Sequence, residues 1–346
     1  MPAPKPIRII GGGLAGLTLG IALRRLEVPV TIDEAGNYPR HRVCGEFISG
    51  RGQSSLARLG MRDVFARAGA IRAQTAAFFS AANSTPPRSL PSPAICLSRF
   101  QLDAALAEKF RELGGELNQG KRVSAENLGE GVVRAGGRRA QTEANSAHWF
   151  GLKLHARKVA LTADLEMHFS PQGYVGLCRL ADGEVNVCGL FRRHAGENVP
   201  ANSRELLRGQ PGSPLRERLA AAEFDDASFC AVAGLSLRPQ RAVERPEICV
   251  GDAITMIPPV TGNGMSMAFE SAELAVVPLA AWSRGEISWA VARQQIARAC
   301  DERFSRRLRW AHWLQQLVLT PALQNPLTLL AARSDGFWRL AFERTR

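Results

Sequence analysis

The sequence predicts an α/β protein with a parallel sheet near its N-terminus, an antiparallel sheet in its middle and helices at its C-terminal end. The first 35 of 346 residues hold a β-type run, a glycine-rich turn, an apolar helical pattern and a second β-type run. Residues 150–191 instead form short alternating runs separated by glycine-bearing turns, which is typical of an antiparallel sheet. After residue 265 the apolar spacing is helical almost to the end.

The composition is that of a folded globular protein, with 45% hydrophobic and 22% charged residues, and the length allows two domains. No apolar run reaches the ~18 residues of a membrane span. The N-terminus opens directly into a strand-like segment, so we expect neither a membrane helix nor a cleaved signal. The seven cysteines show no CxxC spacing, which favours reduced thiols in a cytoplasmic protein over disulfides or a zinc site.

The net charge of +12 comes from 39 arginines and only five lysines. Such a bias indicates arginine usage throughout the chain more than one specific polyanion partner. No basic patch interleaved with aromatic residues appears in the sheet region, so nucleic acid is not expected as a partner. The C-terminal stretch combines arginines with Trp310 and Trp313, and it is either a helix that touches an anionic membrane or one with a solvated arginine face.

The N-terminal pattern is a complete βαβ unit. A strand over residues 7–10 runs into the turn GGGLAG, a helical pattern covers 17–26, and a second strand over 28–32 ends at Glu34. Gly11 permits the tight turn, Gly13 lets a diphosphate approach the backbone, and Gly16 lets helix and strand pack closely.

The helix that follows these glycines supplies the rest of a dinucleotide site. Its N-terminus presents free N–H groups and the positive end of the helix dipole to the diphosphate, and the turn residues Leu14 and Ala15 are expected to contact the cofactor as well. Glu34 lies 18 residues after Gly16, where it can accept hydrogen bonds from a ribose. The unit therefore predicts a Rossmann-like dinucleotide-binding sheet.

A second glycine-bearing loop lies far away in the sequence. Residues 247–250 form a strand that leads to Asp252, and a long helix follows over residues 265–282. Two distant segments of this kind indicate one extended cofactor held from both sides, with Asp252 on its polyol hydroxyls and helix-start amides near its reducible ring. The loop residues expected to contact it are Pro259, Gly262, Asn263, Gly264 and Met265.

The remaining elements are assigned by periodicity and turn residues. We expect helices over 52–60, 99–113, 203–207 and 214–222, strands over 75–81, 116–123 and 131–135, a proline-rich linker or turn over 84–93, and helix breaks near Pro321 and Pro326.

Five segments together resemble the FAD-dependent oxidoreductases of the geranylgeranyl reductase and aromatic-hydroxylase (p-hydroxybenzoate hydroxylase-like) superfamily. They are GGGLAG with Glu34, PRHRVCGEF at 39–47, LSRFQLD at 97–103, SPQGYVGL at 170–177 and the stretch 250–275. The resemblance implies FAD as the cofactor, with Arg42 and Arg99 beside it.

The same resemblance implies a glutathione-reductase-like FAD domain that is discontinuous in sequence. Residues 1–70, 97–140 and 240–285 would build this domain. Residues 71–96 and 145–239 would form an interleaved antiparallel-sheet substrate domain, and 286–346 a helical C-terminal segment.

Cys44 and Tyr174 are the candidate catalytic residues. Cys44 lies in Pro-x-x-Arg-x-Cys-Gly, close to the reductases' Pro-x-x-Lys-x-Cys-Gly, and the adjacent Arg42 and His41 predict extra thiolate character. Tyr174 begins a sheet strand that matches the reductase pattern in part. Lys153 and His155 alternate on one strand face, for which a solvated polar surface is the default interpretation. No histidine has metal-ligand spacing, so no metal is expected.

The reaction type stays open at this point. The Cys44 loop favours reduction of an apolar, isoprenoid-like alkene, and this is the first interpretation, although Gly176 replaces the reductases' tryptophan. The alternatives are hydroxylation of a phenolic or polyketide-like ring and a non-enzymatic carrier of an apolar chain. The halogenases' Trp-x-Trp-x-Ile-Pro motif is absent, which disfavours halogenation.

The electron source and the assembly state are less defined. The chain has no second βαβ unit with its own GxGxxG, so NAD(P)H is expected to bind only transiently or to be replaced by a partner protein. Gly136-Gly137 replaces the superfamily's usual Asp-Gly pair, so the contact of that aspartate has no counterpart here. The sequence gives no oligomeric state.

Overall fold

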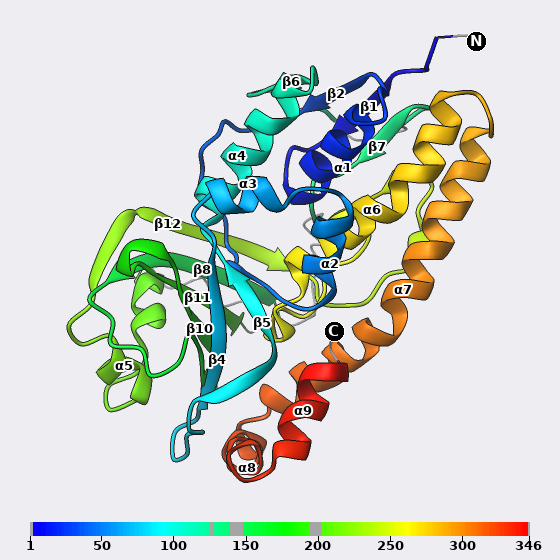
Figure 1. Cartoon of the computed structure of the whole chain (residues 1–346). Coiled ribbons are helices and arrows are strands. Elements are labelled where there is room, and N and C mark those ends of the chain that lie inside the picture. The colour runs from blue at the N-terminus through cyan, green and yellow to red at the C-terminus, as the bar shows by residue number, and fades with distance from the viewer. Residues whose placement is uncertain (1–2, 125–127, 139–147, 194–201, 345–346) are drawn as a thin grey trace.

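The chain folds around two sheets, one parallel and one mostly antiparallel, with a long helical arm along one side (Figure 1). This computed structural model describes residues 3–124, 128–138, 148–193 and 202–344. The predicted boundary between residues 140 and 145 lies outside these ranges.

The parallel sheet has five strands in the order β13-β7-β1-β2-β6, and every neighbouring pair is parallel. Its strands come from three distant stretches of the chain that lie within the predicted segments 1–70, 97–140 and 240–285. They are β1 (Ile7–Ile10), β2 (Val30–Asp33), β6 (Glu116–Asn118), β7 (Val132–Arg134) and β13 (Ile248–Cys249).

Helix α1 (Leu14–Arg24) connects β1 to β2 and is the centre of the core of this half. Its residues from Leu14 to Leu23 are all buried, because α4 covers it on one side and α6 on another. The helix starts three residues earlier than its apolar spacing predicts, since the glycine turn passes directly into it. The other helices of this half are α2 (Arg51–Arg58), α3 (Arg62–Arg67), α4 (Arg99–Glu112) and α6 (Gly264–Ser283).

The second sheet has eight strands in the order β12-β8-β11-β10-β9-β4-β5-β3, antiparallel except for the β4–β9 pair. The predicted runs between 150 and 191 form its centre. Its two-residue strand β3 comes from the N-terminal segment, so the loop before β3 joins the two halves. The strands are β3 (Phe47–Ile48), β4 (Ile71–Phe79), β5 (Arg88–Cys96), β8 (His148–Arg157), β9 (Leu165–Ser170), β10 (Gly173–Arg179), β11 (Val185–Arg193) and β12 (Glu223–Leu235).

Two features of this sheet differ from the sequence prediction. The proline-rich stretch expected to be a linker contains most of β5, because Pro91 and Pro93 are exposed where the pairing with β4 shifts register. Proline is tolerated at such an irregularity, where no ladder hydrogen bond is lost. Strand β12 was not predicted, since two register shifts along its pairing with β8 break the alternation that would mark it.

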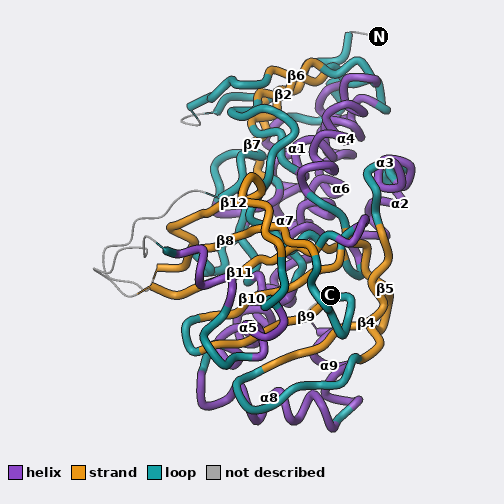
Figure 2. The backbone as a smooth tube through the Cα atoms, turned by 90° about the vertical axis from the view of Figure 1, so that its left-hand side faces the viewer, coloured by secondary structure: helices purple, strands orange, loops and turns teal. Residues whose placement is uncertain are grey.

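The C-terminal arm consists of α7 (Trp289–Val318), α8 (Pro321–Arg333) and α9 (Asp335–Arg344). The expected break at Pro321 is present, but Pro326 lies inside α8 and does not end it. Figure 2 shows α8 and α9 at the end of the molecule opposite β6. In the described part of the chain, no helix is both long and apolar enough to cross a membrane.

The remaining helical pieces are short. The predicted helix over 203–207 is a 3-10 helix, and the one over 214–222 is reduced to α5. These pieces are α5 (Pro214–Arg218) and the 3-10 helices Ala181–Gly183, Ser203–Arg208, Ala242–Glu244, Gly251–Ala253 and Pro259–Thr261.

Candidate cofactor and substrate site

The first glycine turn combines tight packing with an open edge. A Cβ atom on Gly11, whose φ is 108°, would lie 2.5 Å from the carbonyl oxygen of Ala135, and one on Gly16 would lie 2.0 Å from that of Gly11. A Cβ on Gly13 would meet no atom within 4 Å. Gly13 is also the N-cap of α1, and no side chain caps the helix there. The positive end of the helix therefore faces open space, as a bound diphosphate requires.

Glu34 lies directly after β2 and ties the turn together. Its carboxylate accepts hydrogen bonds from the backbone N–H groups of Gly12 (2.8 Å) and Gly36 (2.9 Å) and pairs with Arg40 at 2.7 Å. Burial acts to raise the pKa of Glu34, but Arg40 and the two amides outweigh it and lower the pKa. A carboxylate has about four acceptor sites, so a ribose hydroxyl can still be accommodated.

Positive charge gathers beside this turn. Burial and the neighbouring Arg40 and Arg99 lower the pKa of Arg42, and its buried Nε has no hydrogen-bond partner among the described residues. A buried guanidinium nitrogen without an acceptor is costly unless a ligand supplies one. The position of Arg42 therefore fits a diphosphate.

The second glycine loop abuts the start of α1, as the two-segment cofactor prediction requires. A Cβ on Gly251 would lie 2.8 Å from the Cβ of Ala15, so the chain before Asp252 touches the first glycine turn. Asp252 is half-buried, and none of the described residues forms a hydrogen bond or ion pair with its carboxylate. Burial raises its pKa, against the opposing charges of Arg138 and Arg99. Asp252 is thus an acceptor held ready for a ligand's hydroxyl groups.

The start of α6 repeats the arrangement at the first turn. Gly262 has φ 63°, and a Cβ there would lie 2.0 Å from the ring of Phe47, so only glycine fits. A Cβ on Gly264, the first residue of α6, would meet nothing within 4 Å. Asn263 and Met265 are buried and Pro259 is half-buried. The open points at Gly13 and Gly264, with Asp252 between the two turns in the fold, fit an elongated dinucleotide such as FAD.

Arg99, expected beside the cofactor, is already neutralised within its own helix. Its guanidinium donates two hydrogen bonds of 2.7 Å to Asp103 one turn later. Burial alone would lower the pKa of Arg99, but Asp103 raises it above its usual value. Arg99 therefore contributes shape and hydrogen bonding to the site more than net charge.

The predicted thiolate character of Cys44 is wrong. Burial raises the pKa of this thiol, and the positive charge of Arg99 offsets only part of the increase. The groups that act most strongly on the thiol besides burial are Arg99 and Glu46. Cys44 is therefore a protonated thiol at neutral pH.

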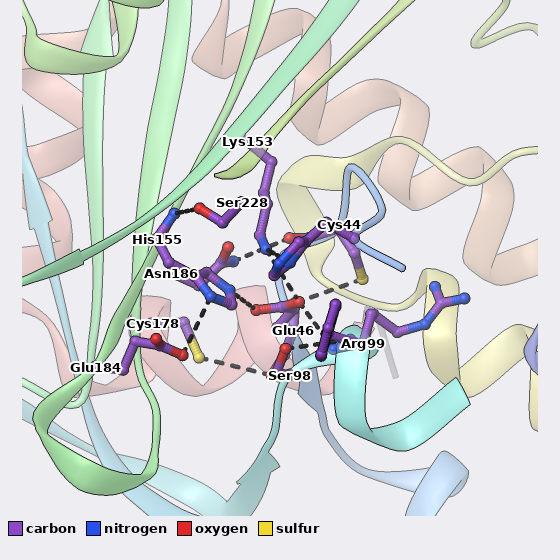
Figure 3. A network of polar contacts seen from close by, with 12 residues as sticks. Cys44, Glu46, Ser98, Arg99, Lys153, His155, Cys178, Glu184, Asn186 and Ser228 are labelled. Atoms are coloured by element: carbon purple, nitrogen blue, oxygen red, sulfur yellow. Dashed lines mark hydrogen bonds and ion pairs between the residues drawn. The ribbon is translucent and has the colours of Figure 1, made fainter. Parts of the chain in front are cut away.

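Lys153 and His155 are not on a solvated face, contrary to the default interpretation. Their side chains are 0% and 2% exposed, because the loop before β3 covers this face of the sheet. The loop brings Glu46, whose carboxylate lies 2.7 Å from His155 Nε2 and 3.6 Å from Lys153 Nζ (Figure 3). Glu46 has φ 59°, an uncommon conformation for a residue with a side chain, which occurs in turns and recurs at active sites.

The network continues in two directions from Glu46. On one side, His155 Nδ1 lies 3.1 Å from Glu184, which is one-quarter exposed and so reaches solvent. On the other, Lys153 Nζ lies 2.9 Å from Nδ1 of His41. Burial, together with the charge of Lys153, lowers the pKa of His41 to about 4. His41 is therefore neutral at pH 7.

Two further residues complete the network. Asn186 donates a hydrogen bond of 2.9 Å to the backbone carbonyl of Cys44, while its buried Oδ1 has no partner among the residues described. Ser228 Oγ accepts the backbone N–H of His155 at 2.7 Å. Sequence reasoning missed Glu46, Glu184, Asn186 and Ser228; only Glu46 had a signal, since it lies in the quoted segment PRHRVCGEF.

Tyr174 is placed away from Cys44. It is 4% exposed and packs in an apolar cluster with Val260, next to the second glycine loop. The backbone carbonyl of Cys44 is hydrogen-bonded to Asn186, which pairs with Cys178 of β10. Cys178 lies four residues beyond Tyr174 on the same strand, which separates the two positions by roughly 13 Å. The structure therefore does not bring the two candidate catalytic residues together.

The Tyr174 hydroxyl is nevertheless suited to a ligand. In the part of the chain that is described, it has no hydrogen-bond partner, and burial raises its pKa well above the usual value. Between Tyr174 and Cys178, a Cβ on Gly176 would meet only backbone oxygens of the same sheet, at 3.7 and 4.0 Å. Tyr174, Gly176 and Cys178 alternate along one face of β10, and the Cys178 thiol donates to the backbone carbonyl of Glu46 at 3.7 Å, so the Tyr174 hydroxyl and the Glu46 network lie at opposite ends of this stretch.

No cluster of three or more potential metal ligands occurs among the described residues. The seven cysteines are all free thiols.

Solved structures of flavin-dependent enzymes share this fold. The flavin-dependent brominase Bmp2 superposes with a TM-score of 0.77 at 16% identity, over 99% of this chain and 93% of that one. PqsL of P. aeruginosa in complex with 2-aminobenzoylacetate superposes with a TM-score of 0.71 at 18% identity, over 93% of this chain and 98% of that one. A flavoprotein/dehydrogenase of Cytophaga hutchinsonii superposes with a TM-score of 0.74 at 14% identity, over 98% of this chain and 90% of that one.

These likenesses confirm the predicted fold, a Rossmann-like domain with an interleaved sheet and C-terminal helices. No protein-family model matches the sequence, and neither does any curated protein. These structures give no support to the preference for a geranylgeranyl reductase. They include a brominase and a protein in complex with 2-aminobenzoylacetate. Another structure of PqsL, described as a probable FAD-dependent monooxygenase, superposes with a TM-score of 0.69 at 16% identity.

Proposed function

We propose that the protein is an FAD-dependent monooxygenase that hydroxylates a small phenolic or polyketide-like ring. The observation that carries the proposal is the buried Glu46–His155–Lys153 network, which lies directly before Phe47, the residue whose ring packs against Gly262 of the second glycine loop. Hydroxylation of a phenolic ring is assisted by groups that accept and move the proton of the ring hydroxyl, and this network supplies such groups.

The chain's own residues would hold FAD at both ends. The amides at the start of α1, beside Gly13, and the side chain of Arg42 would bind the diphosphate, and Glu34 the adenosine ribose. Asp252 would bind the polyol hydroxyls, and the amides at the start of α6 would stabilise negative charge at the ring. When bound, FAD supplies two-electron transfer and reactivity with O₂.

The polar network sets the proton positions next to the substrate. Lys153 Nζ donates to His41 Nδ1, so the neutral ring of His41 carries its proton on Nε2. Glu46 holds a negative charge, since His155 and Lys153 outweigh the effect of burial and lower its pKa. His155 links Glu46 to Glu184 near solvent, which gives a path for a proton to leave the site.

Purified protein loaded with FAD tests this function. We expect NADPH or NADH oxidation that a phenol or aromatic ketone accelerates, with O₂ consumed and one oxygen atom added to the ring, as seen by mass spectrometry. Chloride and bromide are included, because a halogenated product would assign the chemistry of the brominase-like neighbours instead.

Two results would refute the proposal. A protein that takes up no FAD would leave only the carrier interpretation. Anaerobic reoxidation of the reduced protein by an isoprenoid alkene, without any response to phenols, would assign a reductase.

A further inference from the structure

Helix α8 has its polar side facing the protein and its apolar side facing solvent. Gln324 and Thr328 are buried at 6% and 2% exposure, while three leucines are 36–45% exposed. Beyond Pro321 at its first position, which is also exposed, the exposed apolar residues of α8 are Ala322, Leu323, Pro326, Leu329 and Leu330. A surface helix of a globular protein normally shows the opposite distribution.

Specific hydrogen bonds hold α8 in this orientation. Gln324 Nε2 donates to the backbone carbonyls of Ser170 (2.9 Å) and Val318 (3.0 Å), both outside α8. Asn325 accepts the backbone N–H of Ala82 at 3.2 Å. Rotation of the helix would bury the leucines but would break these bonds, so the apolar side stays outward.

The exposed apolar side forms one continuous strip. At about 100° per residue, its five residues fall within an arc of about 120°. Helix α8 contains no acidic residue, and Arg333 ends the strip. Five of the nine large apolar side chains most exposed among the described residues lie between 313 and 340, on the three C-terminal helices.

Size and charge distinguish between the occupants of this strip. A 13-residue helix face measures about 20 Å by 10 Å, or about 200 Å², whereas a stable protein interface needs about 800 Å² per partner. A bilayer requires only shallow insertion of a few side chains. Arg339 and Arg344 of α9 are exposed nearby; of the two acidic residues of α9, Asp335 is paired with Arg88 and Glu343 is exposed.

We propose that the apolar strip of α8 docks the protein on an anionic lipid bilayer, with Leu323, Leu329 and Leu330 in the acyl boundary and arginines at the headgroups. This arrangement is that of an interfacial helix whose polar face is buried in its own protein. It does not depend on which reaction the FAD site performs.

Flotation of the full-length protein with lipid vesicles tests the proposal. We expect binding to vesicles of phosphatidylcholine with phosphatidylglycerol, weaker binding to phosphatidylcholine alone, and loss of the difference in high salt. Leu323→Ser/Leu330→Ser should weaken binding at least about tenfold. Arg333→Glu should reduce the preference for phosphatidylglycerol by about fivefold or more.

The matched control is Val277→Ser, which removes the 73% exposed Val277 of α6 and should bind as the wild type does. Unchanged melting temperatures would show that all variants are folded. Three outcomes would overturn the proposal: no binding of the wild type to either vesicle, equal binding of the leucine double variant, or a dimer by light scattering that the double variant abolishes. The last would assign the strip to a second copy of the chain.

Discussion

Replacement of Glu46 by glutamine should destabilise the protein strongly, although the two side chains have nearly the same shape. The carboxylate is fully buried and accepts the backbone N–H of Arg99 at 2.8 Å, besides its contacts with His155 and Lys153. Glutamine can keep the bond to Arg99, but it leaves Lys153 as a buried cation without a counter-charge. Removal of one partner of a buried ion pair costs about 3–5 kcal/mol, and we expect a loss of about 3 kcal/mol in the free energy of unfolding.

Urea denaturation of the apoprotein, followed by circular dichroism, measures this effect. The control is Glu223→Gln, which breaks an exposed pair with Lys158 and should cost no more than about 0.5–1 kcal/mol. Glu46→Gln/Lys153→Met should recover part of the loss, since it removes the uncompensated cation. A loss below about 1 kcal/mol for Glu46→Gln, or a double variant no more stable than the single one, would refute the electrostatic account.

The same variant predicts a pH dependence. The pKa of Glu46 is lowered from its ordinary value of 4.5, so its ionised form stabilises the fold fully above pH 4.5. This contribution is lost as the pH falls below 4.5 and through the lowered pKa. The stability difference between the wild type and Glu46→Gln should therefore shrink in that acidic range and stay constant above it.

Further variants separate structural from ligand-binding roles. Gly16→Ala should lower apoprotein stability by about 2–3 kcal/mol, because its Cβ would overlap the carbonyl of Gly11. Gly13→Ala should leave the melting temperature unchanged yet weaken FAD binding about tenfold, as read by flavin fluorescence; equal affinity would place the diphosphate elsewhere. Asp252→Asn should raise the apoprotein melting temperature at neutral pH, because burial raises the pKa of Asp252, and should weaken FAD binding; a lower melting temperature would contradict this. The pKa of His41 is about 4, below its ordinary value of 6.5, so between these pH values the unfolded chain binds a proton that the folded chain does not. The free energy of unfolding should therefore fall as the pH drops from 6.5 to 4. Thermal melts of His41→Asn across that interval should show a smaller decrease in melting temperature than the wild type.

The elements predicted correctly are those set by local sequence. The strand at 7–10, the glycine turn and α1 follow one another without interruption, and each has its own pattern. The same holds for β13 with the second glycine loop, since a strand, a turn and a long helix occur in order. Gly11 was predicted at the tight turn, and its φ of 108° there confirms that only glycine suits the position.

The elements missed depend on contacts between distant segments. Whether Lys153 and His155 are buried is decided by the loop that carries Glu46, more than 100 residues earlier, and the strand alone looks half-solvated. The proline-rich part of β5 is predicted as a linker or turn because its local sequence shows no strand pattern. The register shift that accommodates Pro91 and Pro93 arises only from the pairing of β5 with β4. The reversed polarity of α8 depends likewise on Ser170 as a hydrogen-bond acceptor.

The burial of α1 has a consequence for synthesis of the chain on the ribosome. Its apolar residues are covered by α6, which begins 240 residues after α1 ends. At about 5–20 residues per second, the nascent chain exposes this helix for roughly 10–50 s before its cover is made. Chains that terminate before residue 264 should therefore aggregate or be held by chaperones, and no N-terminal fragment should be released as an independent nucleotide-binding domain.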